Sequence, residues 1–252
     1  MSFDVAADAY DRFIGRYSVI LAPRFADFAH VTAGDRALDV GCGPGSLTAE
    51  LVRRLGAANV AAVDPSASFV DAAAARNPGA TVRRATAEAL PFPDGAFDRA
   101  LAQLVVHFMT DPVAGLAEMR RVTQSGGVVA ACVWDHAGGT GPLGLFWKAA
   151  RELDPDVDDE SKLAGVREGH LAELFEAAGL HDIESTTLSA DREHPNFDDW
   201  WDPFTRGAGP AGSYVVTLEP GRRDALRELC RTRIPAGRFM VTARAWAARG
   251  LA

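Results

Sequence analysis

The sequence predicts an α/β protein built on a doubly wound sheet of seven strands, mostly parallel, with an antiparallel last strand. From about residue 36 onward, short β-branched runs alternate with amphipathic helical segments, which is typical of parallel sheets covered by helices. A glycine-rich turn follows the first of these runs. The 252 residues suit one domain, whose core needs no disulfide or metal ion to stabilise it.

The predicted elements follow in chain order. The first strand is expected at residues 37–40, and Ser46 is expected to cap the N-terminus of the next helix, which ends before Gly56. Asp111 and Pro112 mark another helix start, as a cap followed by proline. Further strands are expected at residues 60–63, 81–85, 99–106, 128–134, 183–188 and 238–248, and further helices near residues 66–74, 143–152, 168–178 and 224–232.

Two segments interrupt the alternation. Residues 135–166 are rich in Gly, Pro and Asp, and residues 194–235 begin with aromatic residues and turn formers. Each follows a strand, and ligands of doubly wound sheets bind beyond the carboxyl ends of strands. We therefore expect one domain over residues 1–252, with these two segments as partial cap insertions and a capping helix within about residues 1–30.

Composition narrows the partners and the compartment. The formal net charge is −8, and the densest run of arginines, at residues 222–233, is interleaved with Asp224 and Glu228, so no nucleic-acid partner is expected. No apolar run approaches the roughly 18–20 residues that span a bilayer, and the N-terminus does not resemble a signal peptide. The three cysteines have no metal-ligand spacing, so the sequence predicts reduced thiols and no metal site. Together these features predict a cytoplasmic protein without membrane contact. A monomer or a homodimer is expected.

The glycine-rich turn carries the strongest functional signal. Gly41, Gly43 and Gly45 lack Cβ atoms, so the backbone can bend sharply and lie against a ligand beside the positive end of a helix. Asp64 follows at the predicted end of the second strand, where a carboxylate can accept hydrogen bonds from two ribose hydroxyls. The pair predicts a nucleoside ligand.

The glycine spacing bears on which nucleoside is bound. Dinucleotide sites favour G-x-G-x-x-G, whereas this turn reads G-x-G-x-G, with Ser46 at the sixth position. An NAD(P)-dependent oxidoreductase remains an alternative at this point. It would need a hydride-transfer constellation such as Tyr-x-x-x-Lys, and neither Lys148 nor Lys162 follows a tyrosine at that spacing.

Four motifs in order resemble the class I S-adenosylmethionine (SAM)-dependent methyltransferases, in particular the type 11, ubiquinone-biosynthesis-like group. They are ALDVGCGPGSLT at residues 37–48, VDPS at 63–66, ATAEALPFPDGAFD at 85–98 and EMRRVTQSGGVV at 118–129. AYDRFIGRYS at residues 9–18 also resembles the helix that covers the cofactor in this group. Beyond residue 135 the resemblance extends to the fold alone. It implies a Rossmann-like sheet, SAM as the methyl donor and S-adenosylhomocysteine as the product.

The resemblance also implies a role for individual residues. Those near the methionine moiety would be Tyr17, Asp39, Gly41, Gly43, Gln103 and Leu104. Asp64 would hold the ribose diol, and the adenine would lie among Pro65, Ser66, Thr86, Ala87 and Glu88. Thr86 departs from the pattern, since many relatives carry an Asp there that bonds the adenine amino group.

The acceptor is less defined. His107, just past the fourth predicted strand, is the candidate catalytic base for an acceptor that must lose a proton. His136, after the fifth predicted strand, is a weaker candidate for the base. His194 and the Trp200-Trp201 pair are candidates for the acceptor pocket, although the tryptophans can equally pack a lid helix. The predicted function is methyl transfer to an unidentified small molecule, with a weak indication from nearby aromatic residues that it is apolar. A non-catalytic SAM-binding regulatory protein is the main alternative.

Overall fold

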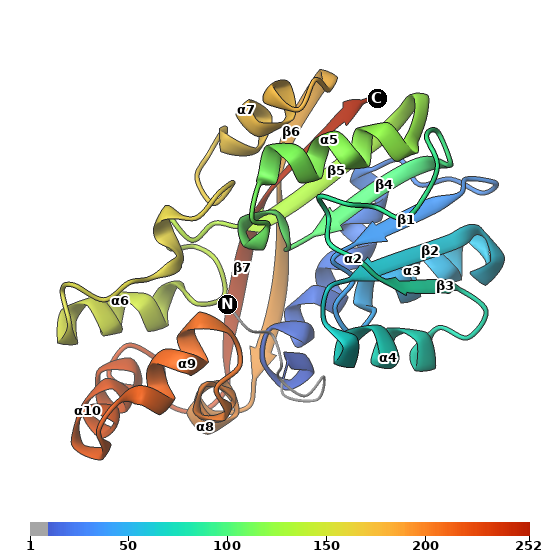
Figure 1. Ribbon diagram of the computed structural model, residues 1–252. Helices are drawn as coiled ribbons and strands as arrows, with labels where there is room; N and C mark the ends of the chain where they lie inside the picture. The colour runs from blue at the N-terminus through green and yellow to red at the C-terminus, as the bar shows by residue number, and fades with distance from the viewer. Residues whose placement is uncertain (1–9) are drawn as a thin grey trace.

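A computed structural model describes residues 10–252, and its centre is a seven-stranded sheet in the order β3-β2-β1-β4-β5-β7-β6 (Figure 1). The strands are β1 (Ala37–Val40), β2 (Val60–Asp64), β3 (Thr81–Arg84), β4 (Phe97–Gln103), β5 (Thr123–Trp134), β6 (His181–His194) and β7 (Phe239–Leu251). Strand β7 runs antiparallel to both β5 and β6, while the pairs among β1 to β5 are parallel. The predicted sheet, with its antiparallel last strand, is confirmed.

Helices cover both faces of this sheet. Side chains of a strand point alternately to its two faces. Leu38 therefore packs with α5 and α7, while Ala37 packs with α2 and α3 on the opposite face. The helices are α2 (Arg16–Phe28), α3 (Ser46–Leu55), α4 (Ala67–Arg76), α5 (Pro112–Val122), α6 (Gly144–Leu153), α7 (His170–Ala177), α8 (Phe197–Trp201), α9 (Gly209–Thr217) and α10 (Pro220–Arg231). Shorter turns are η1 (Asp11–Gly15), η2 (Ala57–Asn59), η3 (Val106–Phe108), η4 (Glu160–Lys162) and η5 (Asp202–Arg206).

The two insertions meet at one end of the sheet. Helix α6 comes from the first insertion and helices α8, α9 and α10 from the second, and the four lie together beside one end of β7 (Figure 1). They share an apolar core in which Phe146 stacks on Phe204 with ring centroids 4.4 Å apart. Phe13 of η1 joins this core, so the N-terminal segment contacts the cap.

Some predicted boundaries need correction. Ser46 is the first residue of α3 and not its cap; Gly45 caps the helix with a left-handed φ of 95°, a conformation that glycine adopts without strain. The fourth strand ends at Gln103 and not at residue 106, because Leu104 turns the chain with a φ of 64°. Asp111 does cap α5 as predicted, accepting a hydrogen bond from the Ala114 N–H at 3.0 Å.

The last two strands are longer than the sequence suggests. Strand β6 was expected at residues 183–188 but runs to His194, where it pairs with Phe239 of β7. The additional residues of β6 pair with β7, and Ala190 is buried with residues of α2. The capping helix expected within residues 1–30 corresponds to η1 and α2 from Asp11 onward, and its first nine residues lie outside the described part.

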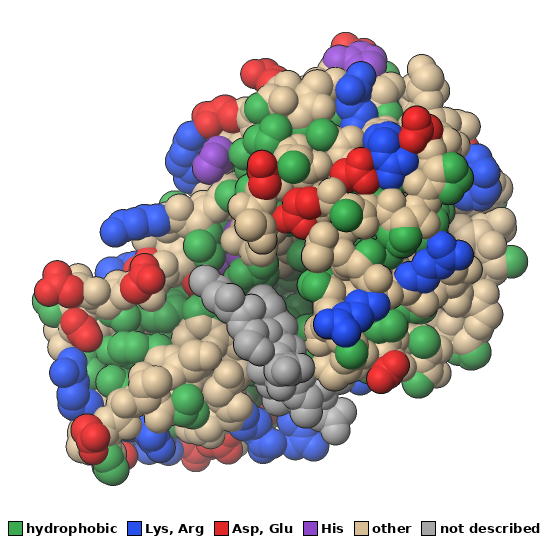
Figure 2. Space-filling model, in the orientation of Figure 1, with side chains coloured by type: hydrophobic (Ala, Val, Ile, Leu, Met, Phe, Trp, Pro, Cys, Tyr) green, Lys and Arg blue, Asp and Glu red, His purple; other side chains and the backbone are tan. Residues whose placement is uncertain are grey.

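The surface carries charges of both signs. On the face shown in Figure 2, Lys and Arg side chains are interspersed with Asp and Glu side chains, in keeping with the interleaved charges of the sequence. Among residues 10–252, no helix combines the length and the apolar character needed to cross a membrane.

Candidate active site

The largest cavity that we identify lies beyond the carboxyl ends of β1, β2 and β4 and has a volume of about 460 Å³. Pockets that hold small ligands commonly measure about 300–1,000 Å³. Its lining comprises Tyr10, Gly41, Gly43, Asp64, Pro65, Phe69, Ala85, Thr86, Ala87, Glu88, Gln103, Leu104, Val105, His107, Phe108, Met109 and Thr110. Nine residues expected at the cofactor therefore come together: Gly41, Gly43, Asp64, Pro65, Thr86, Ala87, Glu88, Gln103 and Leu104.

The glycine turn wraps over the end of β2. The Gly41 and Cys42 N–H groups both donate to the Val63 carbonyl, at 2.8 and 2.9 Å, and the chain then turns with left-handed φ angles at Gly41 (71°) and Gly43 (52°). A Cβ at Gly41 would lie 2.2 Å from a methyl group of Val105. Gly41 is therefore required by both backbone conformation and space.

Asp64 stands at the end of β2 and is held by the turn. Its Oδ2 accepts from the Gly43 N–H and its Oδ1 from the Ser66 N–H, both at 2.9 Å. Burial raises the pKa of this carboxyl, while the two backbone hydrogen bonds oppose that shift. Each oxygen keeps a lone pair, so a fixed carboxylate in the cavity wall can still accept hydrogen bonds from a diol.

A smaller cavity of about 20 Å³ continues from the main one on the side of β1 and α3. Its walls include Asp39, Gly41, Gly43 and Gln103. The Asp39 Oδ2 accepts from the Thr48 hydroxyl at 2.7 Å, but Oδ1 has no hydrogen-bond partner, and neither has the Gln103 Oε1. Two buried acceptors without donors fit a ligand that brings an ammonium group. Burial raises the pKa of Asp39 to about 7.

The main cavity also has apolar side chains in its walls. Phe69, Val105, Phe108 and Met109 line it together with the expected Pro65 and Ala87. None of these four belongs to the site residues expected from the sequence, and Phe69 lies on the helix that directly follows Asp64. A flat heterocycle can pack among such side chains.

Glu88 and Ser66 act mainly on the backbone around the cavity. The Glu88 Oε1 accepts from the Thr110 and Asp111 N–H groups at 2.8 and 3.3 Å, which ties the adenine-side segment to the start of α5. Ser66 is not among the lining residues that we identify, but its N–H holds Asp64.

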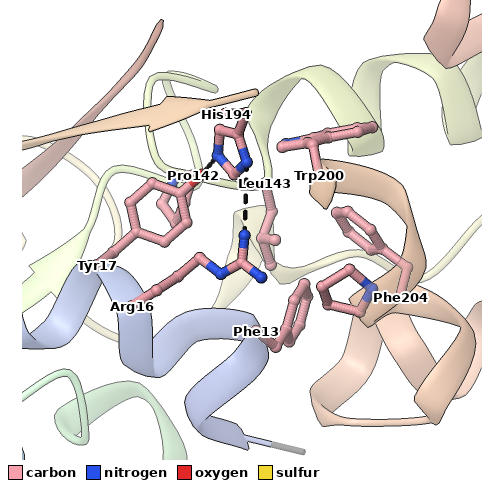
Figure 3. A pocket seen from close by; sticks show the side chains of 9 residues that line it. Phe13, Arg16, Tyr17, Pro142, Leu143, His194, Trp200 and Phe204 are labelled. Carbon is pink, nitrogen blue, oxygen red and sulfur yellow. Dashed lines mark hydrogen bonds between the residues drawn. The ribbon is translucent and has the colours of Figure 1, made fainter. Parts of the chain in front are cut away.

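Tyr17 lies in a different place from the other expected cofactor residues. Its side chain is buried, and its hydroxyl lies 2.8 Å from the His194 Nε2 (Figure 3). The neighbouring Arg16 donates to the Asp199 Oδ2 at 2.8 Å. These contacts join α2 to the end of β6 and to α8, so Tyr17 and His194 connect the sheet to the cap. Together with Phe13, Leu143, Trp200 and Phe204 they line a pocket of only about 10 Å³ (Figure 3).

A second cavity of about 40 Å³ adjoins the main one under the cap. Tyr10, Leu104, His107 and Phe108 line both cavities. The other walls are largely apolar, but they include two polar side chains; the lining residues are Phe13, Ile14, Trp134, His136, Leu143, Glu160, Gly209 and Pro210.

His107 is the residue that most directly joins the two cavities. It belongs to η3, is 6 % exposed, and its Nδ1 has no hydrogen-bond partner. Burial holds the pKa of this imidazole well below its usual value, and that of His136 at about 4. Burial also raises the pKa of Glu160 to about 7. His107 is therefore neutral at pH 7 and carries a free lone pair.

The comparisons with known proteins agree with this geometry. A family profile described as a methyltransferase domain matches residues 38–131. An uncharacterised methyltransferase of Mycobacterium tuberculosis is 32 % identical over 193 residues, which cover 74 % of this chain and 70 % of that protein. The chain belongs to the class I SAM-dependent methyltransferases.

Solved structures show the same fold at low sequence identity. A SAM-dependent methyltransferase of Thermotoga maritima matches with a TM-score of 0.54 and 20 % identity, over 97 % of this chain and 98 % of that one. A phosphoethanolamine N-methyltransferase of Haemonchus contortus, solved with S-adenosylhomocysteine, matches with a TM-score of 0.58 and 16 % identity, over 97 % of this chain and 56 % of that one. The cofactor of this methyltransferase is SAM. The ubiquinone-biosynthesis-like subgroup stays a prediction.

Proposed function

We propose that this methyltransferase transfers the methyl group of SAM, bound in the main cavity, to an apolar or aromatic small molecule that approaches from the side of the second cavity. The observation that carries the proposal is the common wall: Leu104 and His107 line both cavities. A donor on one side and an acceptor on the other then meet at this wall. Holding two reactants in contact supplies much of the rate acceleration of a displacement reaction.

The described residues fit SAM along its length. Asp39 and Gln103 offer unpartnered acceptors to its ammonium group, and Asp64 offers a fixed carboxylate to its ribose. The adenine is assigned to the apolar side chains of Pro65 and Ala87. Tyr10, which lines the main cavity, replaces Tyr17 as the proposed aromatic contact from the N-terminal segment, because the Tyr17 hydroxyl is engaged with His194.

The chemistry needs little beyond positioning and a proton acceptor. SAM supplies a methyl group on a sulfonium, and a nucleophile that attacks the methyl carbon in line displaces S-adenosylhomocysteine. The neutral His107 imidazole can take the proton that a hydroxyl or amine acceptor loses. Phe13, Leu143 and Trp134 exclude water from the acceptor side.

Calorimetry tests the first half of the proposal. SAM and S-adenosylhomocysteine are expected to bind, and NAD is expected not to bind. The variant Asp64→Ala is expected to lose affinity for SAM and S-adenosylhomocysteine. NAD binding in the absence of SAM binding contradicts the proposal.

Turnover tests the second half. Purified protein is incubated with SAM and a panel of small phenols, aromatic carboxylic acids and apolar amines, and mass spectrometry follows a gain of one methyl group. Asp64→Ala is the matched control for non-enzymatic methylation. SAM binding without methylation of any panel member would favour the non-catalytic SAM-binding alternative.

A further inference from the structure

Three buried polar side chains from separate segments converge on the second cavity. They are His107 in η3, His136 just after β5, and Glu160 in η4. Their exposed fractions are 6 %, 7 % and 3 %, and one candidate ligand atom from each lies within 4.8 Å of the other two. Buried imidazoles and carboxylates are uncommon, and three in one wall call for a physical explanation.

Hydrogen bonds within the described residues do not satisfy this cluster. The His107 Nδ1 and the His136 Nε2 have no hydrogen-bond partner. The Glu160 Oε1 lies 3.9 Å from the His136 Nε2, beyond hydrogen-bond range. A buried carboxylate without a cationic partner carries a large desolvation cost. A cation placed between the three side chains would give each of them the partner that it lacks.

We propose that His107, His136 and Glu160 bind a divalent transition-metal ion of the zinc type in the wall of the second cavity. Two imidazoles and one carboxylate form a known ligand set for catalytic zinc, which leaves a fourth position open to water or substrate. Ligand atoms about 2.1 Å from a tetrahedral ion lie about 3.4 Å apart. The widest observed spacing, up to 4.8 Å, thus needs a closure of up to about 1.4 Å, within reach of side-chain rotation.

The surroundings also suit a metal centre. Residues that ligate metals are usually hydrogen-bonded in turn by their neighbours, which orients them. The Glu160 Oε2 accepts from the Trp147 indole N–H at 2.9 Å, which leaves Oε1 for the ion. Since all three ligands line the second cavity, the remaining side of the ion faces that cavity.

The site deepens the proposed function, and its acceptor role rests on that function. An ion there binds an oxygen, nitrogen or sulfur atom of the acceptor and lowers the pKa of its proton, as bound zinc does for water. The acceptor loses its proton to solvent; its lone pair then forms the bond to the methyl carbon, and the electrons of the carbon–sulfur bond stay on sulfur. His107 then binds the ion with the same lone pair that would otherwise accept the proton of the acceptor molecule. His107 can therefore act as a metal ligand or as a base, but not as both.

Cobalt titration tests the site without any acceptor. Co²⁺ added to metal-free protein is expected to produce the d–d absorption of a tetrahedral ion, with one equivalent bound, and Zn²⁺ is expected to displace it. His136→Ala and Glu160→Gln are expected to lose this absorption. Trp147→Phe keeps all three ligands and is expected to bind about 10–100-fold more weakly, as for other supporting residues. His181→Ala removes an exposed histidine and serves as the matched control.

Calorimetry with S-adenosylhomocysteine, run on the same variants, shows that they remain folded and separates the two proposals. Absence of a bound ion in wild-type protein, or undiminished binding in both His136→Ala and Glu160→Gln, overturns the metal site and leaves the methyl-transfer proposal standing. Cobalt binding that depends on these residues, without methylation of any acceptor, supports the site and removes its acceptor role.

Discussion

We expect Asp39 to make cofactor binding depend on pH. Its carboxylate is 1 % exposed, Oδ1 has no donor, and burial raises its pKa to about 7. In the proposed binding mode the ammonium group of the cofactor pairs with the ionised carboxylate, so the affinity is expected to rise with pH until Asp39 is fully ionised. With a pKa of about 7, Asp39 is ionised in roughly a tenth of the molecules at pH 6 and in about nine tenths at pH 8. Affinity for S-adenosylhomocysteine should therefore fall about tenfold from pH 8 to pH 6, or about 1.4 kcal/mol.

The assay is calorimetry of S-adenosylhomocysteine binding between pH 6 and pH 8, which avoids turnover. Asp39→Asn keeps the shape of the side chain and the contact with Thr48 but removes the charge. This variant is expected to bind more weakly at pH 8 and to show no pH dependence over this range. A tenfold pH dependence that survives in Asp39→Asn would refute the assignment of the ammonium group to Asp39. A flat profile in the wild type would refute the raised pKa.

Three substitutions test other parts of the structure. Gly41→Ala places a Cβ 2.2 Å from Val105, and thermal unfolding should show a larger loss of stability than for Gly126→Ala, whose φ of 76° is similar but whose Cβ meets open space. Asp64→Ala should weaken S-adenosylhomocysteine at least about tenfold by calorimetry, since charge-assisted hydrogen bonds are lost; unchanged affinity excludes Asp64 from the site. Tyr17→Phe removes the buried hydrogen bond to His194 and should cost about 1–2 kcal/mol, a few degrees in Tm, with cofactor affinity retained. A large loss of affinity in this variant would instead place Tyr17 at the cofactor.

The sequence predicts the parts of the fold that local patterns determine. The predicted positions of strand β1 and of the glycine turn are correct, because both depend on residues that are close together in the sequence. The start of α5 is correct because Asp111 and Pro112 act on the next turn of the chain. The lengths of β6 and β7 are underestimated, since their additional residues pair with each other across a long separation in the sequence.

The same distinction applies to the site. The motif order brings Asp64, Gln103 and the glycines together, because parallel strands deliver their carboxyl ends to one edge of the sheet. The hydrogen bond between Tyr17 and His194 joins residues 177 positions apart, and no local sequence pattern near either residue predicts it. The cluster of His107, His136 and Glu160 is hidden for the same reason: its members have none of the short spacings by which metal sites are recognised in a sequence.

Leu104 explains how one strand end serves both cavities. Strand β4 delivers Gln103 to the cofactor side, and a strand continued to residue 106, as the hydropathy suggests, would carry the chain on past the edge of the sheet. Leu104 instead adopts a φ of 64°, which is costly for a branched side chain and persists where the surroundings enforce it. Its N–H donates to the Cys132 carbonyl of β5 at 2.8 Å, which holds the turn. The chain then enters η3, and His107 reaches the wall between the cavities. The strain at Leu104 is thus tied to the position of His107 in the wall that the two cavities share.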